Sequence, residues 1–261
     1  MDDNRGAARQ IDLNCDMGES FGAYRIGADE AVMPLITSAS IACGFHAGDP
    51  LVMRRTVRLA REHGVAVGAH PGYRDLAGFG RRTMKCSPDE VYTDVLYQIG
   101  ALAAFCRAEG VPLRHVKPHG ALYNTAAADP ATAEAVARAV ADFDRSLALY
   151  APPGSALERA GLSAGLRVVR EAFADRGYAA DGSLLPRSHP GAVLADPELA
   201  AAQARRIACD GTVTAGTGET VAVPAGTLCV HGDHPNAVDV LRRIREELAA
   251  AGVTVAPPHA W

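Results

Sequence analysis

The sequence lacks the features that mark several large classes of protein. No apolar run approaches the roughly 18 residues of a membrane-spanning helix, so we expect no membrane partner. The formal net charge of -4 gives no electrostatic reason to expect a nucleic-acid partner. The six cysteines are scattered without a C-x-x-C pair, which predicts reduced core thiols in a cytoplasmic protein.

The two best-known phosphate-binding sequences are also absent. The chain has no G-x-x-x-x-G-K-[ST] sequence and no strand-linked G-x-G-x-x-G. Gly216-Thr217-Gly218 is instead the predicted turn of a hairpin over residues 213–223. The sequence therefore does not show where a nucleotide would bind.

The length and composition favour a single large domain. The chain has 261 residues, 48% of them hydrophobic, which is enough to bury one large core. Residues 1–10 are polar and charged and have no apolar core, so we do not expect them to be a signal peptide. We expect them to be a disordered or tag-like lead-in, followed by one α/β domain over residues 11–261.

Strand and helix signals alternate along the chain. Helices are predicted to begin at Asp49, Ser87, Asp129 and Asp196, each of which can cap a helix and is followed by a proline. About seven strand-then-helix units predict a parallel sheet. The predicted strands cover approximately residues 11–16, 36–43, 65–69, 115–118, 147–151, 168–174 and 228–230.

Polar residues at nearly every strand end favour a closed (β/α)7-type barrel over an open, doubly wound sheet. In an open sheet such residues would concentrate at one switch point, whereas a barrel brings all strand ends to one face. Together they could hold a divalent metal, activate water or move protons. The strand-end residues are Asp12, Asp16, His46, His70, Lys117, His119, Asp175, His231 and Asp233.

Seven segments with distinctive motifs follow one another along the chain, at residues 12–19, 41–50, 68–73, 78–82, 116–124, 173–176 and 229–233. In this order they resemble the LamB/YcsF family, and the resemblance extends over approximately residues 11–251. It implies a seven-stranded barrel similar to the glycoside hydrolase/deacetylase superfamily.

The resemblance implies a subunit of an ATP-hydrolysing 5-oxoprolinase that works with subunits B and C. The reaction is the opening of the lactam of 5-oxoproline to L-glutamate. It uses ATP, and we expect Mg²⁺ to arrive with the nucleotide. The sequence leaves open whether the protein also holds a metal permanently, because every ligand would have to come from a different strand.

For this reaction we expect one set of catalytic residues and one set of substrate-binding residues, drawn from the strand ends and from positions close to them. Asp12 or Asp16 would be the general base, and the histidines would move protons. Lys117 and Arg176 would contact anions. The expected catalytic residues are Asp12, Asp16, His46, His70, Lys117, His119 and Asp175. The expected substrate-binding residues are Asn14, Glu19, Arg176, His231 and Asp233.

Two other functions are compatible with the same residues. The chain could act alone as a metal-dependent deacetylase or carbohydrate hydrolase. It could also be a small-molecule-binding subunit without catalytic activity.

Overall fold

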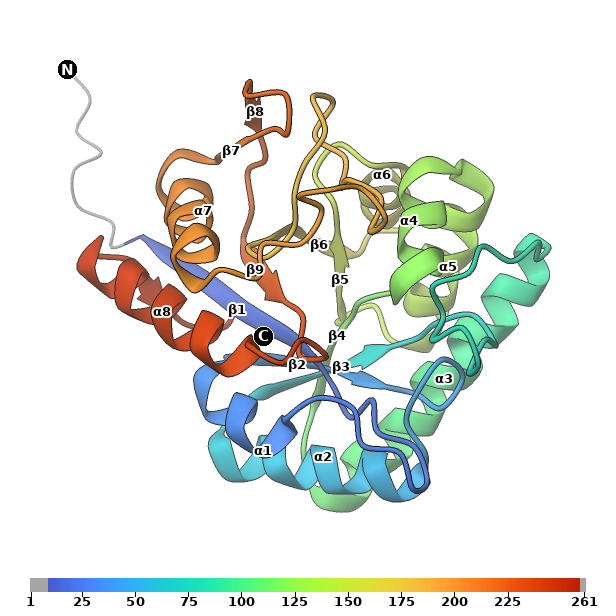
Figure 1. Ribbon diagram of the computed structural model, residues 1–261. Coiled ribbons are helices and arrows are strands. Elements are labelled where there is room, and N and C mark those ends of the chain that lie inside the picture. Colours follow the sequence, from blue (N-terminus) through green and yellow to red (C-terminus); the bar gives the residue numbers. More distant parts are fainter. Residues whose placement is uncertain (1–8, 259–261) are drawn as a thin grey trace.

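The computed structural model describes residues 9–258, and in this part of the chain seven parallel strands close into a barrel (Figure 1). Each strand pairs with the next, and β9 pairs with both β6 and β1 to complete the ring. This confirms the predicted barrel. The strands are β1 (Gln10–Met17), β2 (Ser38–Ala42), β3 (Ala66–His70), β4 (Leu113–Val116), β5 (Ala148–Ala151), β6 (Arg167–Phe173) and β9 (Thr227–Val230).

Helices surround the barrel on its outside (Figure 1). The predicted caps at Asp49, Ser87, Asp129 and Asp196 are confirmed, since each side chain accepts a backbone N–H of the helix that follows. The helices are α1 (Asp29–Val32), the 3-10 turn η1 (Met33–Leu35), α2 (Pro50–His63), α3 (Pro88–Glu109), α4 (Gly120–Ala128), α5 (Pro130–Phe143), α6 (Ala156–Ser163), α7 (Pro197–Asp210) and α8 (Ala237–Ala250). No helix in the described residues is both long and apolar enough to span a membrane.

Three short strands lie outside the ring. The predicted hairpin is confirmed as β7 (Thr212–Thr214) and β8 (Thr220–Ala222), which pair antiparallel. The two-residue strand β10 (Thr254–Val255) was not predicted, and it pairs with the first two residues of β1. β1 begins at Gln10, the last residue of the predicted lead-in, and residues 1–8 of that lead-in lie outside the described residues.

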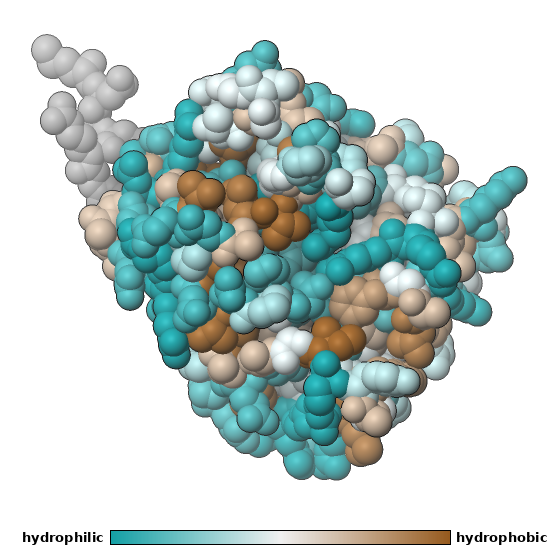
Figure 2. Space-filling model, in the orientation of Figure 1, coloured by the Kyte–Doolittle hydropathy of each residue, from teal (hydrophilic) through white to brown (hydrophobic). Residues whose placement is uncertain are grey.

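The two faces of the barrel strands have opposite chemistry. Leu13 and Cys15 of β1 face outwards into the hydrophobic core, as their alternation predicts. Burying one such leucine stabilises the fold by roughly 2 kcal/mol. The inward-facing residues of the same strand are polar, so the space inside the barrel contains the acids. The face shown in Figure 2 is mostly hydrophilic, with hydrophobic residues in small separate groups.

A glycine makes room for a ring inside the barrel. Gly68 of β3 lies beside His115, and a Cβ atom at residue 68 would lie 2.1 Å from Nε2 of that ring. His115 also stacks on Tyr150, with ring centroids 4.2 Å apart, and its Nε2 lies 3.1 Å from the hydroxyl of Ser40. The interior below the mouth is therefore filled by side chains.

Candidate active site

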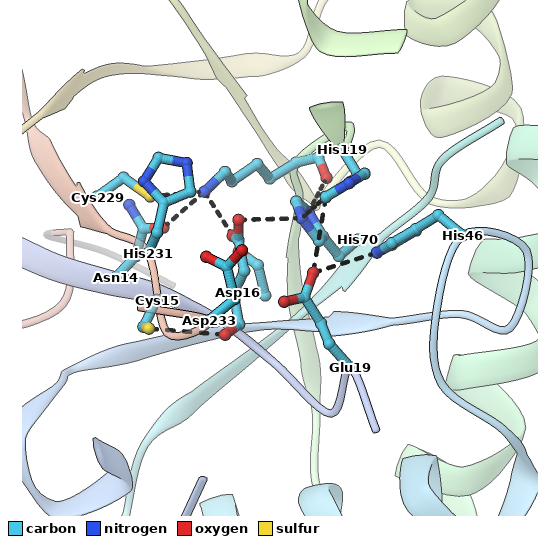
Figure 3. A network of polar contacts seen from close by, with 12 residues as sticks. Asn14, Cys15, Asp16, Glu19, His46, His70, His119, Cys229, His231 and Asp233 are labelled. Carbon is cyan, nitrogen blue, oxygen red and sulfur yellow. Dashed lines mark hydrogen bonds and ion pairs between the residues drawn. The ribbon is translucent and has the colours of Figure 1, made fainter. Parts of the chain in front are cut away.

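The strands end at one mouth of the barrel, and most of the predicted site residues lie there (Figure 3). They come from β1, β3 and the segments that follow the barrel strands. In Figure 3, His231 and Asp233 lie on one side of Asp16, and three histidines lie on the other. The residues at the mouth are Asp16, Glu19, His46, His70, Lys117, His119, Asp175, His231 and Asp233.

Lys117 is a buried cation surrounded by acceptors. Its Nζ lies 2.7 Å from Asp16 Oδ1, 3.2 Å from Asn14 Oδ1, 3.2 Å from Glu171 Oε1 and 3.0 Å from Cys229 Sγ. Burial alone would lower the pKa of Lys117, but the Asp16 carboxylate and its neighbours outweigh this and hold the pKa well above its usual value. An ammonium has only three protons, so protein groups occupy all of them.

The same contacts keep Asp16 ionised. Burial would raise the pKa of Asp16, but His70 and Lys117 together hold it well below its usual value. Nε2 of His70 lies 3.3 Å from Oδ2 of Asp16. Asp16 is therefore an anion in the middle of the mouth, between the lysine and the histidines.

Glu19, His46, His70 and His119 form a second cluster, which we call the histidine cluster. One potential ligand atom from each of the four lies within 4.8 Å of the other three, and all four residues are buried. The rings of His46 and His119 stack with centroids 3.7 Å apart. Burial and the neighbouring imidazoles lower the pKa values of both His46 and His119 well below the usual range, so these rings are neutral.

Asp175 and His231 form an aspartate–histidine pair. Asp175 accepts the backbone N–H of His231 at 2.8 Å, and the ring Nδ1–H of His231 lies 3.0 Å from the same oxygen. Burial would raise the pKa of Asp175, but these contacts lower it overall. With Nδ1 donating to the carboxylate, Nε2 of His231 is left as an acceptor.

Asp12 does not lie at the mouth, and the expectation that it would was wrong. It is level with Thr227, the first residue of β9, at the opposite end of the barrel. Asp12 and Asp16 share a face but are four residues apart, which is roughly 13 Å along a strand. Thr37, Ser38, Tyr150 and Thr227 donate hydroxyl hydrogen bonds to its carboxylate.

Two predicted substrate-binding residues are already engaged by the protein. The amide group of Asn14 donates to Glu171 and Thr227, and its oxygen accepts from Lys117. Arg176 donates to the carbonyls of Leu185 and Ala192, which anchors the loop after β6. Burial and nearby Arg187 lower the pKa of Arg176 to about 10. The structure thus places both residues as supports for the mouth.

Sequence reasoning missed three residues that contact the site. Glu171 and Cys229 both approach Lys117, and Arg81 forms an ion pair with Asp233 at 2.7 Å. Glu171 could have been found, because it lies four residues before Asp175 and shares its strand face. Arg81 lies in a loop without periodicity, so no spacing in the sequence relates it to the barrel mouth.

A closed parallel barrel with acids, imidazoles and an ammonium at the ends of its strands defines a barrel enzyme rather than a simple binding scaffold. The chain belongs to the LamB/YcsF family, whose model matches residues 11–261.

Known relatives match nearly the whole chain. The A subunit of 5-oxoprolinase from Symbiobacterium thermophilum is 82% identical over 256 residues, which is 98% of each chain. The crystal structure of a "Lactam Utilization Protein" from Thermus thermophilus superposes with a TM-score of 0.90 at 56% identity, covering 95% of this chain and 99% of the other. A family 4 carbohydrate esterase from Streptomyces lividans has a TM-score of 0.50 at 12% identity, covering 96% and 93%, and this likeness shows the fold alone.

Proposed function

We propose that this chain is the A subunit of an ATP-hydrolysing 5-oxoprolinase, in which it opens the lactam of 5-oxoproline to give L-glutamate. The near-full-length identity to proteins of that name supports the substrate and the reaction. The observation that carries the proposal is the Asp175–His231 pair at the mouth of the barrel. The ring Nδ1–H of His231 donates to Asp175, so its Nε2 can accept a proton next to the Asp16–Lys117 ion pair.

An unstrained amide resists attack by water, and phosphorylation by ATP activates it. Transfer of the γ-phosphoryl group to the amide oxygen makes the carbonyl carbon electrophilic and releases ADP. A first water adds to that carbon, and the ring C–N bond then breaks as the nitrogen takes a proton. A second water releases the phosphoryl group as phosphate, so one ATP and two waters give glutamate, ADP and phosphate.

We propose that His231 moves these protons. Its free Nε2 takes a proton from the attacking water, and the resulting imidazolium returns that proton to the ring nitrogen. Asp175 stabilises the imidazolium and fixes its orientation. Lys117 acts through Asp16, which it keeps ionised and in place, because its own protons already face protein acceptors.

The nucleotide and the partner subunits belong to the same proposal. We infer that ATP arrives with Mg²⁺, bound chiefly through phosphate oxygens. We propose that phosphoryl transfer requires subunits B and C, and the sequence of this chain has no known phosphate-binding loop that would locate the nucleotide. The six cysteines are all free thiols, which supports a cytoplasmic location.

Reconstitution with separated subunits tests this function. The chain alone, subunits B and C together, and the full complex are each given 5-oxoproline and Mg²⁺–ATP, and glutamate and phosphate are measured. We expect glutamate only from the complex, with one phosphate per glutamate. Glutamate formation by subunits B and C without this chain would refute the proposal. Deacetylation of an acetylated sugar by the chain alone would also refute it.

A further inference from the structure

Two backbone carbonyls fix which ring nitrogens of the histidine cluster carry hydrogen. Nδ1 of His70 lies 2.7 Å from the carbonyl oxygen of Lys117, and Nε2 of His119 lies 2.8 Å from that of Phe79. A carbonyl oxygen can only accept, so each of these nitrogens must donate. The remaining nitrogens, Nε2 of His70 and Nδ1 of His119, therefore carry lone pairs when the rings are neutral.

These two lone-pair nitrogens lie only 2.9 Å apart. Two acceptors cannot hydrogen-bond to each other, so a positive centre must lie between them or beside them. The surroundings also present negative charge and lone pairs: Oδ2 of Asp16 lies 3.3 Å from the His70 nitrogen, and Oε1 of Glu19 lies 3.7 Å from the His119 nitrogen. Figure 3 shows these side chains directed toward one another.

A shared proton would satisfy the His70–His119 pair alone, but it would not account for the rest of the cluster. His46 also directs Nε2 toward Glu19, at 3.4 Å, so a third imidazole and a carboxylate converge on the same point from separate segments. His70 and His119 each donate their other N–H to a backbone carbonyl, which is the usual support of metal-bound histidines, whereas Nδ1 of His46 is buried without a hydrogen-bond partner among the described residues. Four buried ligand atoms match a metal ion better than a proton.

We propose that Glu19, His46, His70 and His119 bind one divalent transition-metal ion at the barrel mouth, with Asp16 beside it. Imidazole ligands suit Zn²⁺ or Mn²⁺, whereas Mg²⁺ prefers oxygen, so this ion is distinct from the one that accompanies ATP. When bound, such an ion supplies Lewis acidity that activates water. The proposed metal site does not depend on the proposed function. Only the catalytic role of the metal rests on that function.

Metal binding to the full-length chain is the direct test. The protein is stripped with a chelator, dialysed and titrated calorimetrically with Zn²⁺, Mn²⁺ and Mg²⁺, and bound metal is counted by elemental analysis. We expect one Zn²⁺ or Mn²⁺ per chain with a Kd of about 1 μM or tighter, and no comparable binding of Mg²⁺ without nucleotide. If the wild-type chain binds neither Zn²⁺ nor Mn²⁺, the proposal is overturned.

Variants locate the site. His70→Ala and His119→Ala should each weaken binding by at least about 100-fold. His63→Ala, on the exposed end of α2, and His231→Ala, at the other side of the mouth, should bind like the wild type. If His70→Ala or His119→Ala fails to fold, His46→Gln is the substitute, and far-UV circular dichroism identifies the folded variants. Unchanged binding in folded cluster variants would also overturn the proposal.

Activity separates this inference from the proposed function. If the complex forms glutamate but the chain binds no transition metal, the site is wrong and the function stands. If metal binds but the complete complex forms no glutamate, the site stands and the function fails. If the metal-free complex is fully active, the site stands without the catalytic role.

Discussion

The ammonium group of Lys117 lies 2.7 Å from Asp16 and 3.2 Å from Glu171, and it is the cation that these two buried carboxylates share. These two contacts of Lys117 connect β1, β4 and β6 across the interior of the barrel. Removing one partner of a buried ion pair leaves an uncompensated charge, which costs more than the pair itself contributes. Lys117 must therefore affect both stability and catalysis.

The first prediction is that Lys117→Met, which keeps the volume of the side chain, lowers the free energy of unfolding by about 3–5 kcal/mol. Activity of the complex should also fall sharply, because Asp16 loses the group that holds it ionised. Urea unfolding of the free chain measures the stability. In the Lys117→Met background, Glu171→Gln should recover part of the loss because it removes one of the two unpaired charges. No recovery would show that Glu171 is not coupled to the lysine.

The second prediction separates the two aspartates of β1. Asp12→Asn should lower the free energy of unfolding by about 1–3 kcal/mol, because it disturbs four hydroxyl donors, of which Ser38, Tyr150 and Thr227 are buried. It should leave kcat per folded molecule unchanged. Asp16→Asn should instead lower kcat. Steady-state kinetics on protein corrected for its folded fraction measure both effects. A low kcat for folded Asp12→Asn would return this residue to the catalytic set.

The contrast between these aspartates shows what the sequence could reveal. Alternation along β1 correctly separates residues that face outwards from residues that face inwards, because the side-chain period of a strand is two. It cannot give the height of a residue inside a barrel, since that depends on how neighbouring strands are staggered. Asp12 was therefore placed on the correct face but at the wrong end.

The helices show a similar division between local and distant signals. The ends of α2 could be predicted because Asp49 caps its start and Gly64 adopts a left-handed conformation at its end, with φ of 67°. Helix α4 was missed, because its N-cap residue, His119, makes no side-chain capping bond and α5 begins two residues after α4 ends. The histidine cluster was predicted only as separate residues, because its members meet through tertiary folding.

The third prediction concerns acid stability and Glu109. This carboxylate ends α3 and accepts from Arg54 and Arg58 of α2, at 2.7 and 2.9 Å. Hydrogen bonds from Arg58 and Arg54 lower the pKa of Glu109 from 4.5 to about 2. A lowered carboxyl pKa stabilises the fold above the unfolded-state value, and this contribution disappears as the pH falls from 4.5 to about 2.

Glu109→Gln should therefore melt below the wild type at pH 7, and the difference in melting temperature should narrow as the pH falls from about 4.5 to 2. Thermal melting of both proteins across this pH range measures the difference. Glu62→Gln, on the exposed surface of α2, is the matched control and should change the melting temperature little. A difference that does not depend on pH would mean that Glu109 acts by packing rather than by charge.

The last prediction tests the Asp175–His231 pair through Asp175→Asn. In the wild type the carboxylate accepts both the backbone N–H and the ring Nδ1–H of His231. The single side-chain oxygen of an asparagine would still accept the hydrogen bond from the backbone N–H of His231. The NH₂ group of the asparagine would then face Nδ1. The ring must then carry its hydrogen on Nε2, which removes the lone pair that accepts the proton from water.

Asp175→Asn should therefore lower kcat of the folded complex by about 10²–10⁴-fold while KM changes little. Asp233→Asn, which removes an acid that pairs with Arg81 at the same mouth, is the comparison and should have a much smaller effect on kcat. His231→Ala should match Asp175→Asn, and added imidazole should restore part of its activity, because a free base can then take the proton. A normal kcat in folded Asp175→Asn would exclude His231 as the general base. Asp16 would then be the remaining candidate for the general base at the mouth.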